Sequence, residues 1–377
     1  MSASAISALS HEVRLIVMDE PSAALDPDEV DNLFRIVGDL TADGVAVVYI
    51  SHRLEEIRRI GDRVTVLKDG RAVAVGLPAK ETPTREVIAL MTGRNVEYVF
   101  PERAPRDQDD SRLPEPVLVV QGLARDGEFA PLDLELRPGE IVGLAGLVGS
   151  GRSEILETIY GARKPTGGQV LVDGRVLRPG SVRAAVRAGL GLAPEERKAQ
   201  GLLMLESVTR NVSVSSMSRF SYGGWLDRTK EREAARTATR ELSLRPDNPS
   251  VPVRTLSGGN QQKAVLARWL LRGCRVLLLD EPTRGVDVGA RAELYTVIRR
   301  LADEGLAVLL VSSEVPEVLG LADRVLVLRE GRVVHTAPAH DLDEHRVLDL
   351  VLASSTPGPT LTKGPHGPAT TEGSPAS

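Results

Sequence analysis

The chain has 377 residues, of which 42% are hydrophobic and 26% charged, and its formal net charge is -5 at pH 7. This length allows two domains with proper cores, and the acidic balance argues against nucleic acid as the main partner. The sequence has no apolar run of the roughly 18 residues that a membrane span needs, and residues 1–11 show no secretory signal pattern. Its single cysteine, Cys274, excludes an internal disulfide framework and fits a reducing compartment.

A long internal repeat organises the chain. Residues 14–22, Arg-Leu-Ile-Val-Met-Asp-Glu-Pro-Ser, resemble residues 275–283, Arg-Val-Leu-Leu-Leu-Asp-Glu-Pro-Thr, and two further pairs of segments match in the same way. The offset is constant, because 280 − 19, 305 − 44 and 323 − 62 all equal 261. Three matches without a gap indicate a tandem duplication. Since position 1 corresponds to position 262, we expect the chain to begin partway through the first repeat.

The repeat and the composition predict the domain boundaries. Residues 1–98 are expected to be the C-terminal part of the first domain, and residues 99–115, which are polar and contain proline, a linker. Residues 116–353 are expected to form the second domain. Residues 354–377 are rich in Ser, Thr, Pro and Gly and cannot bury enough apolar surface to fold, so a disordered tail is predicted.

Strands and helices alternate in the second repeat. Short apolar runs, which suit strands buried on both faces, alternate with segments of helical pattern. The predicted strands lie at 117–120, 141–144, 276–279 and 307–311, and the predicted helices at 153–160, 228–242 and 291–304. This alternation predicts an α/β fold with a largely parallel sheet.

A glycine-rich segment separates the predicted strand 141–144 from the next helix. It reads Gly-Leu-Val-Gly-Ser-Gly-Arg-Ser, and its candidate phosphate-binding residues are Gly146, Gly149, Ser150, Gly151, Arg152 and Ser153. Glycines let backbone N–H groups turn inward around a phosphate, and the helix N-terminus adds a favourable field. The Ser153 hydroxyl is expected to reach Mg²⁺. Arg152 stands where lysine is usual, so we expect nucleotide binding here to survive better than catalysis. An ordinary glycine-rich turn is the alternative.

Two carboxylates end the apolar run 276–279. Asp280 is expected to hold Mg²⁺ through water, and Glu281 to polarise the attacking water. The same pair recurs in the first repeat as Asp19 and Glu20. This recurrence weakens the alternative, an acidic pair that merely caps a helix.

Residues 256–263, Leu-Ser-Gly-Gly-Asn-Gln-Gln-Lys, resemble the signature of the ABC ATPases. Three further segments carry variant forms: 194–198 (Pro-Glu-Glu-Arg-Lys), 280–287 (Asp-Glu-Pro-Thr-Arg-Gly-Val-Asp) and 312–317 (Ser-Ser-Glu-Val-Pro-Glu). Together with the glycine-rich segment they look like the second domain of the tandem ATPases in bacterial monosaccharide importers of the ribose, xylose and galactose types. The resemblance covers residues 12–352.

The resemblance implies a P-loop NTPase fold with a parallel-sheet core, a small antiparallel β subdomain and a helical subdomain near residues 203–255. It also implies ATP and Mg²⁺ as ligands. In the family, each ATP lies between the phosphate loop of one domain and the signature of the other. The signature positions here are Ser257, Gly258, Gly259 and Asn260.

Three further positions follow from the resemblance. Glu195 occupies the place of a glutamine that senses Mg²⁺ and touches the permease. His52 matches the switch histidine that contacts the γ-phosphate, and the equivalent place in the second repeat is Ser313, since 313 − 52 is 261. The second repeat thus lacks both the lysine and the histidine, which suggests one hydrolytic site and one that mainly binds.

By resemblance, the protein is an ATP-hydrolysing subunit that energises monosaccharide import, peripheral on the cytoplasmic face of the plasma membrane. Its partners would be integral-membrane permease subunits, with an extracytoplasmic sugar-binding protein in the same system, and a second ATPase copy is compatible. The pattern does not identify the sugar.

Two alternatives stay open. A soluble tandem ABC protein usually carries a long charged linker or zinc-binding cysteines, neither of which is seen here. A catalytically incomplete fragment is the other, because the first phosphate loop and signature would fall at 152 − 261 and 257 − 261, before residue 1. On this basis the chain alone is expected to bind ATP weakly and to turn over slowly or not at all.

Overall fold

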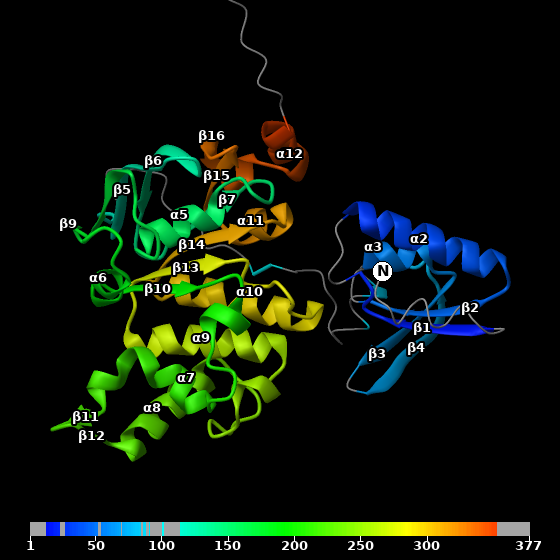
Figure 1. Cartoon of the computed structure of the whole chain (residues 1–377), viewed down its shortest axis with the longest axis horizontal. Coiled ribbons are helices and arrows are strands. Elements are labelled where there is room, and N and C mark those ends of the chain that lie inside the picture. The colour runs from blue at the N-terminus through cyan, green and yellow to red at the C-terminus, as the bar shows by residue number, and fades with distance from the viewer. Residues whose placement is uncertain are drawn as a thin grey trace, which may run out of the picture.

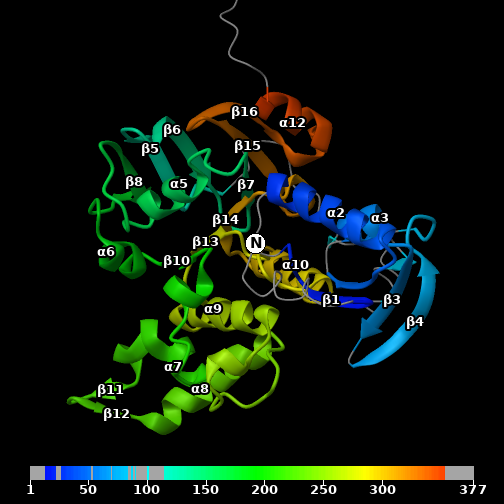
Figure 2. The same cartoon turned by 45° about the vertical axis from the view of Figure 1, so that its right-hand side comes forward.

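A parallel pair of strands opens the described chain. In the computed structural model, β1 (Leu15–Asp19) pairs with β2 (Ala46–Ile50) across α2 (Pro27–Ala42). α3 (Leu54–Ile60) and an antiparallel pair, β3 (Arg63–Lys68) and β4 (Arg71–Pro78), follow. Figure 1 shows these elements together in blue, and Figure 2 shows them from a second direction. The structure describes residues 13–22, 27–51, 54–68, 70–83, 86–87, 90, 100–101 and 114–352. The predicted tail and most of the predicted linker lie outside these ranges.

A six-stranded sheet forms the centre of the second repeat. Its order is β10-β13-β14-β7-β15-β16, and every neighbouring pair is parallel except β15 with β16. The strands are β7 (Ile141–Ala145), β10 (Leu190–Ala193), β13 (Val276–Asp280), β14 (Ala307–Ser312), β15 (Arg324–Arg329) and β16 (Arg332–Pro338). All residues of β7, β13 and β14 are buried. The prediction of a largely parallel sheet, buried on both faces, is therefore confirmed.

The duplication is preserved in the strand register. Leu15 of β1 lies opposite Ala46 of β2, and Val276 of β13 lies opposite Ala307 of β14. Both 276 − 15 and 307 − 46 equal 261, the offset found in the sequence. The two repeats therefore place equivalent residues at equivalent positions of a parallel strand pair.

Helices cover the central sheet. α5 (Arg152–Ile159) packs on β13, α11 (Val315–Leu321) on β7 and β14, and α12 (Glu344–Leu352) on β15. α6 (Val182–Arg187) and α9 (Gly258–Arg272) pack on β10, and α10 (Val288–Asp303) lies against α9. α10 begins three residues earlier than predicted, because the Asp287 side chain accepts a hydrogen bond from the Ala290 N–H and so caps the helix.

Two smaller parts flank the sheet. An antiparallel sheet has the order β6-β5-β8-β9, with β5 (Leu118–Arg125), β6 (Phe129–Leu136), β8 (Gly167–Val172) and β9 (Arg175–Val176). The helical part contains η3 (Arg197–Gly201), α7 (Val208–Ser213), η4 (Val214–Arg219), the strands β11 (Ser221–Tyr222) and β12 (Trp225–Leu226), α8 (Arg228–Glu241) and η5 (Val253–Thr255). Within the described ranges, no helix has the length and apolar character needed to cross a membrane.

Candidate functional site

Four loops leave the same edge of the central sheet. The strands β10, β13, β14 and β7 are neighbours and parallel, so their carboxyl ends lie side by side. The glycine-rich loop follows β7, and Glu195 follows β10. Asp280 and Glu281 stand at the end of β13, and Ser313 follows β14. In α/β proteins with parallel sheets, ligands bind at this edge.

The glycine-rich loop needs its glycines. Gly149 and Gly151 have φ angles of 82° and 93°, which favour glycine. A Cβ on Gly146 would lie 2.7 Å from the Leu328 carbonyl oxygen, and one on Gly151 would lie 3.0 Å from that of Glu128. Gly151 is also the N-cap of α5. The loop therefore passes close to neighbouring backbone and brings its own N–H groups to a helix start, a geometry that suits a phosphate group.

Hydroxyl groups lie on both sides of this helix start. The Ser153 hydroxyl donates to Asp280 Oδ1 at 3.1 Å, across 127 residues of sequence. The Ser150 hydroxyl is buried and has no hydrogen-bond partner among the described residues. A serine hydroxyl beside a carboxylate is an oxygen donor set that fits a hard divalent cation. No group of three or more His, Cys, Asp or Glu suited to a metal occurs in the described ranges.

Burial raises the pKa values of both carboxylates at the end of β13. Burial raises the pKa of Asp280 to about 6, against the opposing hydrogen bond from Ser153. Burial also raises the pKa of Glu281, against the attraction of Arg152 and the hydrogen bond from Ser313. Carboxylates with raised pKa values at a strand edge are typical of functional sites, because binding there is stronger once water is excluded.

Arg152 is already engaged within the protein. Its guanidinium is buried, donates to the Ser312 carbonyl oxygen, and lies 3.5 Å from Glu281 Oε1. Burial lowers its pKa, and the nearby carboxylates oppose this. Arg152, which stands where lysine is usual, therefore pairs with Glu281, the carboxylate predicted to polarise the attacking water.

Ser313 contacts the same carboxylate from the other side. Its hydroxyl donates to Glu281 Oε2 at 3.1 Å. The structure thus shows Ser313 in contact with Glu281, and the switch role of its position stays a prediction. The corresponding His52 lies outside the described residues, so its predicted role stays a prediction.

The two carboxylate pairs share an unusual backbone. Glu20 and Glu281 have φ angles of 43° and 45°, in the left-handed region that glutamate rarely adopts. The Glu20 N–H donates to the Ile50 carbonyl oxygen and the Glu281 N–H to that of Val311, both at 2.9 Å. Strain retained at equivalent positions of both repeats indicates a functional constraint. Asp19 and Glu20 close β1, and the described residues 13–90 supply no glycine-rich loop beside them.

A buried glutamate that we did not predict lies behind the site. Glu317 of α11 accepts hydrogen bonds from the hydroxyl groups of Thr283, at 2.9 Å, and Ser312, at 2.5 Å. It thereby joins the loop after β13 to the end of β14. The pKa of Glu317 is raised to about 7, first by burial and further by the charges of Glu314 and Glu281.

The first repeat contains the same network. Glu56 accepts from the hydroxyl groups of Ser22, at 2.8 Å, and Ser51, at 3.0 Å. These three residues correspond to the Glu317 network at the offset of 261. The signal for this pair of glutamates was therefore present in the repeat, although sequence reasoning assigned them no role.

Replacing Glu317 with glutamine is expected to change how stability depends on pH. The folded pKa of about 7 exceeds the ordinary value of 4.5. The protonated carboxyl therefore contributes about 3 kcal/mol to the free energy of unfolding. This contribution is fully present below pH 4.5 and is lost as pH rises through 7. Glu317→Gln keeps the group neutral and removes this part of the pH dependence. Urea unfolding between pH 4.5 and pH 8 measures it.

The exposed Glu344 offers a matched control for this measurement. Glu344→Gln should leave the pH dependence of the parent chain unchanged, because the side chain lies at the start of α12 and is exposed. An equal slope for the parent and for Glu317→Gln would contradict the prediction.

The signature residues begin α9. Ser257 is the N-cap, and its hydroxyl accepts from Asn260 Nδ2 at 3.0 Å. A Cβ on Gly258 would lie 2.3 Å from the Gly285 carbonyl oxygen, and one on Gly259 would lie 2.6 Å from the Ala290 Cβ. The two glycines therefore allow close packing against the loop after β13 and against α10. The N–H groups at the helix start remain suited to an anion.

An arginine that we did not predict joins three parts of the site. Arg197 is buried, and its guanidinium donates to the carbonyl oxygens of Arg284 and, at 2.9 Å, Gly285. Its Nε donates to Gln261 Oε1 of α9 at 3.4 Å. The neighbouring Glu195, at the position that the resemblance assigns to sensing Mg²⁺ and touching the permease, forms an ion pair with Arg284. The turn after β10 is therefore tied both to the signature helix and to the loop after β13.

Removing this guanidinium should destabilise the chain. Arg197→Ala leaves two carbonyl oxygens without their donor and is expected to lower the free energy of unfolding by about 2–3 kcal/mol. Arg197→Lys should not restore it, because an ammonium group cannot reach three acceptors in a planar arrangement. Urea denaturation tests this, with the exposed Arg183→Ala of α6 as the control. Equal stability of Arg197→Ala and Arg183→Ala would refute the assignment.

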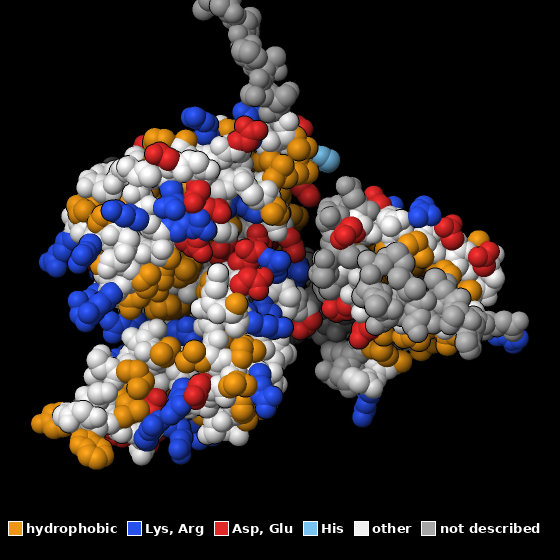
Figure 3. Space-filling view, in the orientation of Figure 1, with side chains coloured by type: hydrophobic (Ala, Val, Ile, Leu, Met, Phe, Trp, Pro, Cys, Tyr) orange, Lys and Arg blue, Asp and Glu red, His pale blue; other side chains and the backbone are white. Residues whose placement is uncertain are grey.

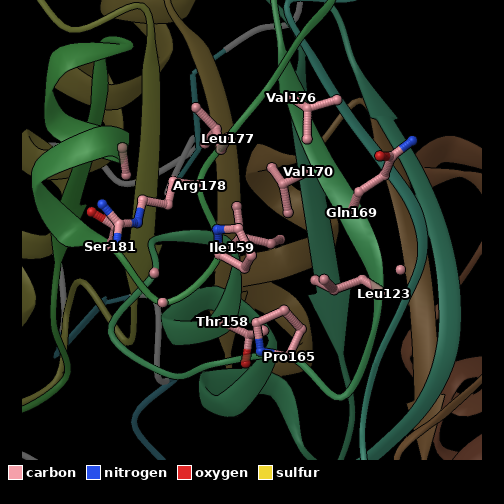
Figure 4. Close-up of a pocket in the computed structure, with 15 residues that line it drawn as sticks. Leu123, Thr158, Ile159, Pro165, Gln169, Val170, Val176, Leu177, Arg178 and Ser181 are labelled. Atoms are coloured by element: carbon pink, nitrogen blue, oxygen red, sulfur yellow. The ribbon is translucent and has the colours of Figure 1, made fainter.

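A separate pocket lies at the far end of α5. It has a volume of about 220 Å³ and is lined by apolar side chains such as Leu123, Ile159 and Val170, with Arg178 and Ser181 at one side (Figure 4). Thr158 and Ile159 end α5, whereas the glycine-rich loop begins it. The pocket contains none of the predicted site residues, so it is not part of the candidate site.

The ABC transporter family model matches residues 129–284. Among curated proteins, the chain is 50% identical over 94% of its length to ribose import ATP-binding protein RbsA 2 of Rubrobacter xylanophilus. It is 45% identical over 92% to RbsA of Corynebacterium glutamicum and 44% identical over 97% to RbsA 2 of Streptomyces coelicolor. The chain spans 66%, 64% and 69% of the lengths of these three relatives.

Two solved structures share the fold. One is cbiO1 of Clostridium perfringens, part of the ABC transporter complex cbiONQ, with a TM-score of 0.53 and 22% identity over 64% of this chain and 97% of that one. The other is a nucleotide-free ATP-binding cassette from an ABC transporter, with a TM-score of 0.54 and 18% identity over 64% of this chain and 96% of that one. The predicted P-loop NTPase fold is therefore confirmed, and the relatives above show that the chain belongs to the family of ATP-binding proteins of bacterial monosaccharide ABC importers.

Proposed function

We propose that this chain is an ATP-binding and ATP-hydrolysing subunit that energises import of a monosaccharide through membrane permease partners. The observation that carries the proposal is the contact between Ser153 and Asp280, with Glu281 beside them at the strand edge. It brings a glycine-rich loop and a buried carboxylate strand together at one point. The names of the curated relatives support ribose as a candidate sugar.

The residues have distinct tasks in this proposal. The backbone N–H groups of residues 146–153 would hold the phosphate chain of ATP, and Ser153 with Asp280 would hold Mg²⁺, which when bound offsets the phosphate charge. Glu281 would orient the attacking water. Ser257 to Asn260, at the start of α9, would contact the γ-phosphate of an ATP held by another domain.

The second-repeat site is better suited to holding ATP than to splitting it. Arg152 pairs with Glu281, and Ser313 also donates to this carboxylate. Arg152 lies beside Oε1 and Ser313 donates to Oε2, so both oxygens that would orient the attacking water are already engaged. We therefore assign faster hydrolysis to a site that would include Glu20 and His52, and storage of ATP to the site at Arg152.

In this proposal, contacts with the permease are assigned to the segment after Glu195. The segment after Glu195 carries the exposed apolar side chains of Leu203 and Leu205, which suit docking of a permease at the cytoplasmic face of the membrane. The domain boundaries at residues 98, 115 and 353, a sugar-binding protein in the same system and a second ATPase copy belong to this proposal as predictions.

The test is ATP binding and turnover by the purified chain. We expect binding of a fluorescent ATP analogue that depends on Mg²⁺, with turnover well below one per second. Glu281→Gln and Glu20→Gln should leave binding in place. Absence of any analogue binding would defeat the proposed function, whereas turnover of several per second that Glu281→Gln abolishes would overturn the assignment of storage to the Arg152 site.

A further inference from the structure

A short hairpin in the helical part carries two almost fully exposed aromatic side chains. Tyr222 of β11 lies directly opposite Trp225 of β12 in an antiparallel pair, and residues in this relation project from the same face. Tyr222 is 91% exposed and Trp225 is 84% exposed. Aromatic residues make up only 3% of the chain. Two large rings together in solvent indicate a contact site rather than a packing role.

The hairpin holds these rings away from the rest of the domain. Gly223 and Gly224 have φ angles of 56° and 87°, as a tight two-residue turn between strands requires. The base is fixed, because the Asp227 N–H donates to the Phe220 carbonyl oxygen at 2.9 Å and the Phe220 side chain is buried. Figure 1 shows β11 and β12 at one extremity of the molecule. The rings therefore project on a short, supported tip.

The base of the tip carries an excess of basic side chains although the whole chain is acidic. Four basic side chains are exposed at its base: Arg219, Arg228, Lys230 and Arg232. Three acidic residues lie nearby. Asp227 caps α8 and pairs with Lys230 at 3.3 Å, Glu231 is buried and accepts from Ser213 at 2.7 Å, and Glu233 is exposed. The basic side chains therefore exceed the acidic ones by one, since 4 − 3 is 1. Figure 3 shows hydrophobic side chains at this extremity with Lys and Arg side chains next to them.

We propose that this hairpin is a membrane-contact site that inserts Tyr222 and Trp225 into the headgroup region of an anionic lipid bilayer. Tyrosine and tryptophan suit this region, because one end of each ring is apolar and the other forms hydrogen bonds with water. A basic residue near an anionic surface strengthens binding about fivefold. The tip offers two side chains, whereas a stable protein interface needs roughly 1,000 Å² of buried surface. The proposal goes beyond nucleotide binding and does not require it.

Tryptophan fluorescence tests the insertion directly. The chain has two tryptophans, and Trp269 is buried with its indole N–H donating to the Leu192 carbonyl oxygen at 2.8 Å. A change in emission on adding lipid therefore reports Trp225. With vesicles of phosphatidylcholine and phosphatidylglycerol we expect a blue shift and co-sedimentation, both weakened by salt. With phosphatidylcholine alone we expect much weaker binding.

Variants separate the contribution of the two aromatic side chains to vesicle binding from that of the basic side chains. Tyr222→Ser with Trp225→Ser should weaken co-sedimentation about tenfold or more, and Arg228→Gln with Lys230→Gln should weaken it on anionic vesicles only. Leu352→Ser, an exposed apolar residue of α12, is the matched control and should bind normally. Circular dichroism would verify that each variant is folded. An unchanged Trp225 emission, or normal vesicle binding by the aromatic double variant, would overturn the proposal. The proposal would also be overturned if a detergent-solubilised permease changed the Trp225 emission while the chain did not bind vesicles.

Discussion

Asp280→Asn is expected to remove most of the Mg²⁺-dependent part of ATP binding while making the protein more stable. The carboxylate accepts the Ser153 hydroxyl at 3.1 Å and would supply the negative charge for the cation. Asparagine keeps the size and one acceptor oxygen but loses that charge. We expect affinity for a fluorescent ATP analogue to fall about tenfold or more in Mg²⁺, and to change little in a chelating buffer.

Asp280→Asn is expected to weaken ATP binding but to raise the stability of the fold, and this combination makes the prediction specific. Burial raises the pKa of Asp280 to about 6, above its ordinary value of 3.8. The stabilisation of the protonated form is present below pH 3.8 and lost as pH rises through 6, so the ionised group destabilises the fold at pH 7. A neutral asparagine should therefore raise the free energy of unfolding at pH 7 by about 1–3 kcal/mol. Weaker binding could then not be attributed to unfolding.

The exposed Asp341→Asn serves as the control, and it should bind the analogue like the parent chain. The assignment fails if Asp280→Asn binds equally well with and without Mg²⁺ at the affinity of the parent, or if the chelating buffer shows the same loss.

Leu278→Ala is expected to cost about 2–5 kcal/mol of unfolding free energy, whereas Leu15→Ala should cost less than about 1 kcal/mol. The two leucines lie on equivalent strands of the duplicated unit, β13 and β1. Leu278 is fully buried in the central sheet, but Leu15 is 56% exposed. The same atoms are removed in both variants, so the difference measures burial alone.

Urea unfolding followed by far-UV circular dichroism measures both variants. Ala46→Gly would not serve as a control, because glycine changes the backbone as well as the side chain. Similar losses for the two leucine variants would show that β1 is covered in solution, contrary to the exposure seen in the structure.

Much of the site could be predicted because its residues follow each other closely in the sequence. The loop from Gly146 to Ser153, the pair Asp280 and Glu281 and the helix start at Ser257 each form a local pattern whose chemistry is recognisable from residue type and order. The offset of 261 also predicted that Ser313 occupies the place of His52, and the structure puts Ser313 3.1 Å from Glu281.

Other parts depend on distant contacts that no local pattern records. Arg197 reaches acceptors 64 and 88 residues away, and Glu317 reaches Thr283 across 34 residues. The engagement of Arg152 with the Ser312 carbonyl oxygen, across 160 residues, is of the same kind. Long side chains can turn in several directions, and only the packing around them selects one.

The sequence by itself determined the duplicated unit and the parallel sheet, and its motifs resemble the family that the relatives then showed. It also predicted which residues form the phosphate loop, the carboxylate strand and the signature. These features depend on residue type, spacing and apolar periodicity, which are local properties. Only the tertiary structure decided which charges neutralise one another, which glutamate is buried behind the site, and that Tyr222 and Trp225 project into solvent. Burial and pairing depend on the whole surroundings of a side chain, so they become defined only when distant segments pack together.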